Sequence, residues 1–316
     1  MKYGAWAAVC AMLVLTACGV EPKPPADKRI QHERSEQRMS IIKWVSTDGD
    51  GSNAASWQGG ALPGDGDIAL LDGTSQVSWT AGLTLAHGAI LRTSESFLGD
   101  IGLPGSYLVM DGNSGADAHE IQAVARHPGK LFLFLDDGAA AEASKTQVVI
   151  DKPDSATGNC HLDGNFVELV ISGGGVTLDA SLTIGEICRF YDGRIYITDG
   201  AGLPLPAQFG GLVECHTGTA PQVYGGTWIQ RKAWAVWSSV AMRGGHIVYD
   251  PVSPVAADIA YDLQAGSLDV RGNAADLFAG LTSTVYIGKN FDLQGIRTID
   301  TTGTRIDYRS DFPTVE

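Results

Sequence analysis

A recurring unit constrains this chain more than any other feature: a glycine, then a short stretch in which apolar and polar residues alternate. The glycines that open these stretches are Gly175, Gly193, Gly211, Gly226, Gly245 and Gly266, at spacings of 18, 18, 15, 19 and 21 residues. Periods of this size are typical of solenoids. A strand so short makes no core alone, so each coil would bury its inward side chains by stacking on its neighbours.

Second strands are expected between these units, at residues 182–184, 235–237 and 285–287. Two or three strands per coil predict an all-β chain folded as a right-handed parallel β-helix. The alternative is an antiparallel β-sandwich, whose turns also recur regularly, and Asp192-Gly193 could close one of its hairpins. Helix-prone residues occur only at 116–125 and 139–144, where we expect turns or short insertions.

The composition supports a folded domain and argues against a nucleic-acid binder. Apolar residues make up 44% of the 316, enough for a real core, and 40 glycines supply many turns. The net charge of −14 would repel phosphates, whereas nucleic-acid binding depends on Lys and Arg. Beyond the N-terminus, no apolar run is long enough to span a bilayer as a helix.

The N-terminus has a composition of its own. Residues 1–18 form an apolar leader after Lys2 and end in Leu-Thr-Ala-Cys, which resembles a lipobox with Cys18 as the lipidation site. Residues 19–40 are proline-rich, then charged, and indicate a linker. Alternatively, translation starts at Met39 and the upstream residues are not part of the protein. Further along, we expect an N-terminal capping region at 41–110, a solenoid body at 111–300 and a polar tail at 301–316.

A pattern near the start of the folded region carries a family resemblance. Its residues are Trp44, Asp48-Gly49-Asp50-Gly51-Ser52-Asn53, Ser56-Trp57, Gly59-Gly60, Pro63, Gly66-Asp67 and Ala69. The pattern resembles the N-terminal capping coil of Gly-rich β-helical proteins, found in bacterial surface β-helices and in structural proteins of tailed phages. The loop Gly99-Asp100-Ile101-Gly102 and the segment 223–228 look more like the phage class. The resemblance implies a structural rather than a catalytic role.

Candidate binding residues each have a plainer interpretation. The side chains of Asp48, Asp50 and Asn53 offer oxygen ligands at spaced positions, as in a calcium loop. No bidentate Glu follows them, and Asp and Asn also favour ordinary turns. We therefore expect no metal and no other cofactor.

Aromatic residues give a second candidate. Trp228, Trp234 and Trp237 lie near Tyr224 in the sequence. Exposed rings could stack on sugars, although rings more often fill cores.

Catalytic candidates are weaker still. Adjacent residues of a strand point to opposite faces, so Asp136 and Asp137 do not share a cleft if both are extended. The cysteines of the body, Cys160, Cys188 and Cys215, form no C-x-x-C pair, so we expect buried free thiols.

We therefore expect a non-enzymatic structural β-helix protein of a phage particle, in the head or the tail. The alternative is an outer-membrane lipoprotein, anchored through Cys18, that binds polysaccharide; a carbohydrate-active enzyme is a weaker third possibility. Expected partners are other virion or surface structural proteins and glycans. A second copy is a further candidate, because an uncapped terminal coil leaves unpaired strand edges.

Overall fold

The computed structural model describes residues 40–64, 66–79, 84–85, 89–111, 123–136, 147–153, 159–235, 238–253, 259–271, 285–294 and 306–309. These residues belong to one compact unit, Arg38–Glu316. Their regular structure is β-strand, apart from one short 3₁₀ turn, η1 (Ala54–Ser56). The leader and most of the linker expected at residues 1–40, with Cys18, lie outside the described residues.

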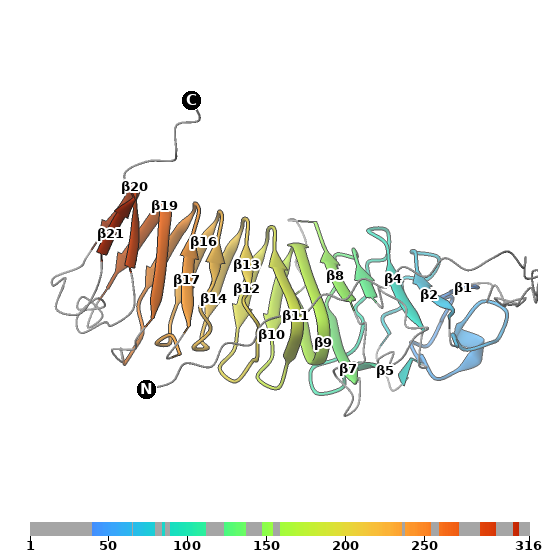
Figure 1. The fold of residues 1–316 in the computed structure, drawn as a ribbon. Helices are drawn as coiled ribbons and strands as arrows, with labels where there is room; N and C mark the ends of the chain where they lie inside the picture. The colour runs from blue at the N-terminus through green and yellow to red at the C-terminus, as the bar shows by residue number, and fades with distance from the viewer. Residues whose placement is uncertain are drawn as a thin grey trace, which may run out of the picture. The chain divides into compact units, whose positions relative to one another are not determined.

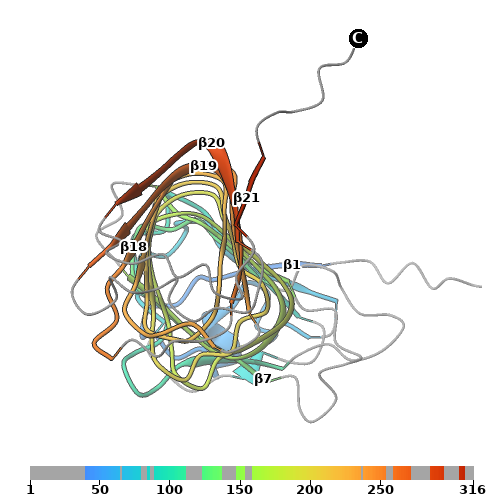
Figure 2. The ribbon, with the colours of Figure 1, turned by 60° about the vertical axis from the view of Figure 1, so that its left-hand side comes forward.

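The strands form two ladders along the same stack of coils (Figures 1 and 2). Ladder A runs through β1 (Ile41–Lys43), β2 (Ile68–Leu71), β4 (Ile90–Thr93), β6 (Ala123–Ala125), β8 (Gln147–Asp151), the second half of β9 (Asn159–Gly173), β11 (Thr183–Phe190), β13 (Ala207–Gln208), β15 (Gln222–Val223), β17 (Ser239–Met242), the first halves of β19 (Ala260–Val270) and β20 (Val285–Gln294), and β21 (Ile306–Arg309).

Ladder B runs beside it through β3 (Thr84–Leu85), β5 (Leu108–Asp111), β7 (Leu131–Asp136), the first half of β9, β10 (Gly175–Leu178), β12 (Arg194–Ile197), β14 (Leu212–Cys215), β16 (Thr227–Gln230), β18 (His246–Tyr249) and the second halves of β19 and β20. Every pairing between these strands is parallel. The predicted parallel β-helix is therefore confirmed, and the antiparallel sandwich is wrong.

In the central coils, the corner that leads from ladder A to ladder B has a constant length. From β11 to β18 the last paired residue of ladder A stands four positions before the first of ladder B, as Phe190 stands before Arg194 and Gln208 before Leu212. The glycine before each ladder B strand has a positive φ, 98° at Gly193 and 69° at Gly211. In β10 that glycine is Gly174, with φ 79°, one position before the Gly175 predicted. Because residues 173–175 are all glycine, the sequence alone did not show which of them precedes the strand.

In these central coils, length varies only on the opposite side, between the end of ladder B and the return to ladder A. Here the chain advances 8 positions from Cys215 to Val223, but 14 from Tyr249 to Leu263. The corner is constrained because backbones pack there, whereas the opposite side holds loops that tolerate insertions. The irregular period of the sequence therefore comes from this variable side.

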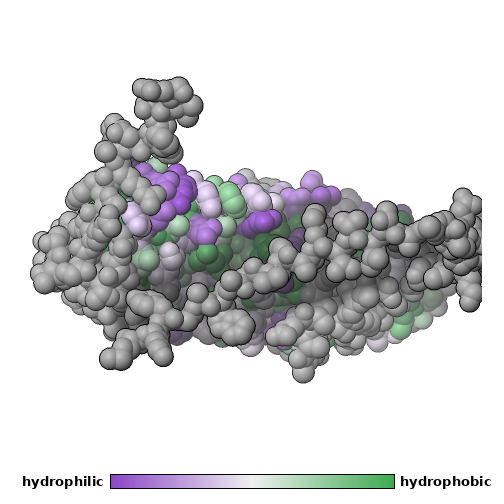
Figure 3. Space-filling model, in the orientation of Figure 1, coloured by the Kyte–Doolittle hydropathy of each residue, from purple (hydrophilic) through white to green (hydrophobic). Residues whose placement is uncertain are grey.

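The inward positions of both ladders form one core. In ladder B two inward columns are filled by Val176, Ile195, Val213, Trp228, Ile247 and Leu268, and by Leu178, Ile197, Cys215, Gln230, Tyr249 and Val270, all of them buried. The expectation for the cysteines is confirmed, since Cys160, Cys188 and Cys215 are buried free thiols on strands. Outside, hydrophilic and hydrophobic residues are interspersed along the face seen in Figure 3.

Three tryptophans fill the core at the N-terminal coils. Trp44 and Trp79 stack with ring centroids 5.5 Å apart, and Trp57 meets both edge-on, at 5.0 and 5.4 Å. The indole of Trp57 donates to the carbonyl of Gly51 at 3.0 Å. A Cβ at Gly51 would lie 1.9 Å from Nε1 of Trp79, so only glycine fits there.

Three local expectations are corrected. Residues 123–125, placed in a turn or insertion, form core strand β6, in which Ala123 and Ala125 are buried. Ala235 is not in a strand, and the rest of the predicted strand 235–237 lies outside the described residues. Within the expected tail, residues 306–309 form β21, because Ile306 continues the ladder A register set by Val285.

Candidate functional site

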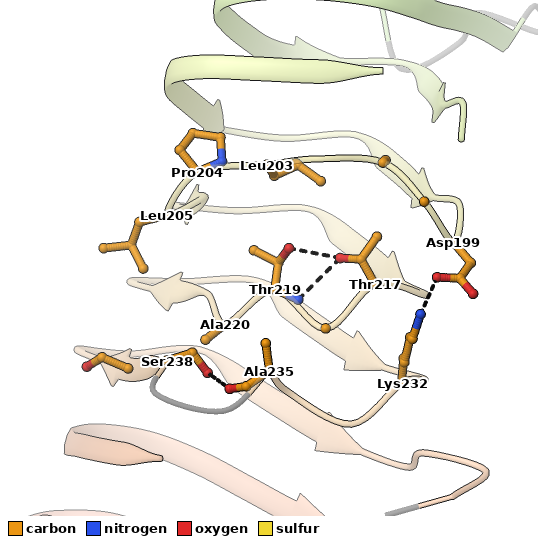
Figure 4. Close-up of a pocket in the computed structure, with 14 residues that line it drawn as sticks. Asp199, Leu203, Pro204, Leu205, Thr217, Thr219, Ala220, Lys232, Ala235 and Ser238 are labelled. Atoms are coloured by element: carbon orange, nitrogen blue, oxygen red, sulfur yellow. Dashed lines mark hydrogen bonds and ion pairs between the residues drawn. The ribbon is translucent and has the colours of Figure 1, made fainter. Parts of the chain in front are cut away.

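The shortest coil leaves a notch on the variable side of the solenoid (Figure 4). Its floor, Thr217 to Ala220, lies between the longer coils on either side (Figure 4). The cavity has a volume of about 600 Å³, and its walls come from Asp199, Gly200, Ala201, Leu203, Pro204 and Leu205 on one side and from Lys232, Ala235, Ser238 and Ser239 on the other. The 15-residue spacing in the sequence thus corresponds to a recess in the surface.

The groups around the notch mostly bind one another. Lys232 Nζ lies 2.5 Å from Asp199 Oδ1, an ion pair that joins the two long coils across the short one (Figure 4). The Thr217 hydroxyl donates to that of Thr219 at 2.9 Å. From the core, the amide of Gln230 donates to the carbonyls of Thr217, at 2.6 Å, and Lys232, at 2.7 Å. The buried glutamine therefore holds floor and wall in place.

Exposed aromatic rings form a stacked column at the corner. This column does not include the tryptophans that were predicted to stack on sugars. Tyr191 stacks on Phe209, and Phe209 on Tyr224, each pair with centroids 4.9 Å apart and rings within 13° of parallel. All three are at least 40% exposed. Each ring comes one position after a ladder A strand, so the constant corner length aligns them.

Of the residues predicted to stack on sugars, only Tyr224 is exposed among those the structure describes. Trp228 is 0% and Trp234 2% exposed, so both belong to the core and are not accessible to a sugar. Trp237 lies outside the described residues. A sugar stacks on a free ring face. Both faces of Phe209 are covered by its neighbours, so the corner column offers such faces only at its two ends.

The loop predicted as a weak calcium candidate is a hydrogen-bonded turn. Asp48 Oδ1 accepts from Ser46 Oγ at 2.9 Å and from the amide of Asp50 at 3.1 Å. Asp50 Oδ1 accepts from the amide of Ser52 at 2.9 Å, and Asn53 Oδ1 from that of Ala55 at 3.0 Å. These bonds lower the pKa of Asp48, first through the backbone of Asp50 and then through Ser46. Within the described ranges, no group of three or more His, Cys, Asp or Glu side chains could hold a metal ion.

A buried polar cluster lies under ladder A near β4, and sequence reasoning missed it. His127 Nδ1 lies 3.0 Å from the Thr93 hydroxyl and its Nε2 3.1 Å from the Lys130 carbonyl. Burial, and then the charge of nearby Lys152, lower the pKa of His127 to about 4. Lys152 is also buried and donates to the Gly129 carbonyl, and burial lowers its pKa. Nothing in the local sequence marks these residues, because they meet only through coil stacking.

The remaining candidate residues have structural partners or fall outside the description. Arg231 bridges Glu214, at 3.0 Å, and Asp250, at 2.8 Å, and so ties neighbouring coils together. Asp136 ends β7, and Asp137 lies outside the described residues. No helix in the described part of the chain is long and apolar enough to cross a membrane.

Comparisons with family models, curated proteins and solved structures found no match to this chain.

Proposed function

We propose that this protein is a non-enzymatic structural component of a tailed-phage particle, a β-solenoid that serves in the head or the tail. The observation that carries the proposal is the pair of continuous parallel ladders, in which backbone hydrogen bonds join each coil to the next. At the corner, the amides of Arg194, Leu212 and Thr227 donate to the carbonyls of Gly174, Gly193 and Gly211 at 2.8 to 2.9 Å. Repeating interfaces of this kind suit a rigid rod.

The packing between coils supports a mechanical role. Leucine, isoleucine and tryptophan side chains are stacked from one coil to the next, and the aromatic column repeats the stacking outside. Partners would then be other particle proteins, and a second copy could add to an open terminal edge.

Purified particles from the host of origin test this proposal. Peptides of this chain should be found in them by mass spectrometry, with an N-terminus at Met39 or Ser40. Particles that lack the chain, or a chain processed at Cys18, would reject the virion role.

A second candidate, a surface lipoprotein that binds polysaccharide, is favoured by the exposed rings on the solenoid. Under this candidate the leader is cleaved and Cys18 is acylated. Labelling cells with an alkyne-tagged fatty acid should mark the wild-type chain and not the Cys18→Ser variant. Equal absence of label from both would reject the anchor.

A further inference from the structure

A hollow lies on the outer face of ladder B where the strand β10 begins. Asn159, Gly175, Arg194 and Leu212 occupy one outward column in register, on four successive coils. Gly175 has no side chain, so between Asn159 and Arg194 the column holds only the Asn159 amide, whose Oδ1 would lie 2.5 Å from a Cβ at Gly175. Two adjoining cavities, of about 610 and 410 Å³, both include these four residues.

Tyr196 provides an open ring face at this hollow. It stands in the next outward column, between Thr177 of the preceding coil and Glu214 of the following one, and is 41% exposed. Its aromatic neighbour His216, from the following coil, has its ring centroid 4.8 Å away. Toward Thr177 and Gly175 the described residues place no ring against it. Unlike Phe209, Tyr196 therefore has a face available to a ligand.

Arg194 is the charged side chain at this hollow that is not engaged in an ion pair within the described residues. Glu214 already lies 3.0 Å from Arg231 and 3.4 Å from His216. Asp192 Oδ1 accepts from the amide of Gly193 at 2.7 Å. Arg194 is exposed, and among the described residues it forms no ion pair. A guanidinium binds a carboxylate through two parallel hydrogen bonds, which gives it a preference for that group.

We propose that this hollow binds an acidic saccharide, a glycan that contains uronate residues. One sugar ring packs its C–H face on Tyr196, because the aromatic face is electron-rich. The uronate carboxylate pairs with Arg194, and ring hydroxyls bond to the amide of Asn159 and the hydroxyl of Thr177. The inference rests on the polysaccharide-binding candidate and names its site; it does not depend on the virion role.

Binding to defined oligosaccharides tests the site in the purified full chain. The probes are oligogalacturonides and hyaluronan fragments, each beside a neutral gluco-oligosaccharide of similar length, measured by calorimetry and saturation-transfer NMR. We expect binding of an acidic probe that weakens with added salt. Tyr196→Ala and Arg194→Ala should each weaken it about tenfold or more, since each removes a principal contact.

Two further variants separate a lost site from a lost fold. Gly175→Leu should fill the hollow and abolish binding. Its φ is not in the left-handed region, and its Cβ would meet only the movable side chain of Asn159, with Oδ1 at 2.5 Å and Cγ at 3.4 Å. Phe209→Ala, at a ring covered on both faces, should bind as the wild type does. Thermal melting of each variant shows whether it is folded.

Three results would overturn the site: no acidic probe bound by the wild type, binding unchanged in Tyr196→Ala and Gly175→Leu, or equal binding of the neutral probes. Lipid on Cys18 without glycan binding would reject this site and retain the anchor. Glycan binding without lipid on Cys18 would retain this site and reject the anchor.

Discussion

Single glycines decide whether the corner can close. Gly193, Gly211 and Gly226 have positive φ, and a Cβ at each would lie 2.5 Å from a carbonyl oxygen of the coil before. The neighbouring atom is backbone, so it cannot move aside without breaking the ladder. The corner glycines therefore permit both the turn and the close stacking of coils.

Replacing Gly211 with alanine tests this requirement. Left-handed φ costs a non-glycine residue about 1–2 kcal/mol, and the contact with the Gly193 carbonyl adds to it. We expect Gly211→Ala to lower the free energy of unfolding by about 2 kcal/mol or more, measured by denaturant titration. Gly185→Ala is the matched control, because its nearest atom would be 3.7 Å away and its φ is ordinary. Equal effects of the two variants would contradict the argument.

His127 should make stability depend on pH between about 4 and 6.5. Its pKa is about 4 in the fold, against 6.5 when exposed, because burial disfavours the charged ring. Below pH 6.5 the unfolded chain therefore binds a proton that the folded chain does not. The free energy of unfolding that depends on His127 staying neutral is therefore complete above pH 6.5 and is lost as the pH falls toward 4.

The variant His127→Gln removes this titration. Between pH 7 and pH 5 the wild type should lose about 2 kcal/mol more stability than the variant does. His246→Gln serves as the control, because His246 is only partly buried, bonded to Ser267 at 2.6 Å. Parallel pH profiles for wild type and His127→Gln, from denaturant titrations at each pH, would show that His127 does not titrate as argued.

At the scale of elements, the two sides of a coil differ in what they tolerate. From β11 to β18 the corner keeps four positions between the ladders, whereas the variable side takes 8 positions from Cys215 to Val223 and 14 from Tyr249 to Leu263. One inserted residue in a strand turns every following side chain to the opposite face. The core therefore requires a constant corner but not a constant loop.

Insertions of two residues, Gly-Ser, measure this difference. After Gly218, on the variable side, the insertion should lengthen the shortest coil toward its neighbours and lower the melting temperature by only a few degrees. Between Gly210 and Gly211 the same insertion should prevent cooperative folding, because it separates the stacked corner backbones. Similar melting temperatures for both would show that the corner length is not a constraint.

At the scale of the whole molecule, a coil packs mainly on the coils beside it, and a few polar pairs, Lys232 with Asp199 and Tyr107 with Asp179, reach past a neighbouring coil. Stability should then be a sum of coil and interface contributions, and damage should spread according to position in the stack. The tryptophan trio occupies the N-terminal end, and Val213 lies in the middle, fully buried. Both ladders pass through that middle without a break.

Hydrogen exchange read by mass spectrometry tests this one-dimensional behaviour. Trp57→Ala removes a buried ring, at a cost of about 3–5 kcal/mol, and should expose β1 and β2 while β10 to β18 stay protected. Val213→Asp buries an unpaired charge and should remove protection on both sides of β14. Uniform loss of protection in Trp57→Ala would indicate a single cooperative unit instead.

The sequence alone determined that the chain is all-β. Glycines at intervals of 15 to 21 residues, each before an alternating strand, favoured stacked coils over a β-sandwich, and the parallel pairings of the structure decided between the two. The absence of a C-x-x-C pair, with the tendency of free cysteine to be buried, correctly predicted buried free thiols. The prediction failed at 123–125, where the alanines look helical but Ala123 and Ala125 fill inward, buried positions of strand β6.

Only the tertiary structure decided the sites. Three features each join residues from different coils. They are the register of the glycines at 173–175, the aromatic column of Tyr191, Phe209 and Tyr224, and the hollow beside Arg194 and Tyr196. Loop lengths on the variable side separate such residues by irregular distances along the chain, so no fixed spacing marks them. The parallel ladders bring them together, because the backbone register, and not the sequence interval, places one coil over the next.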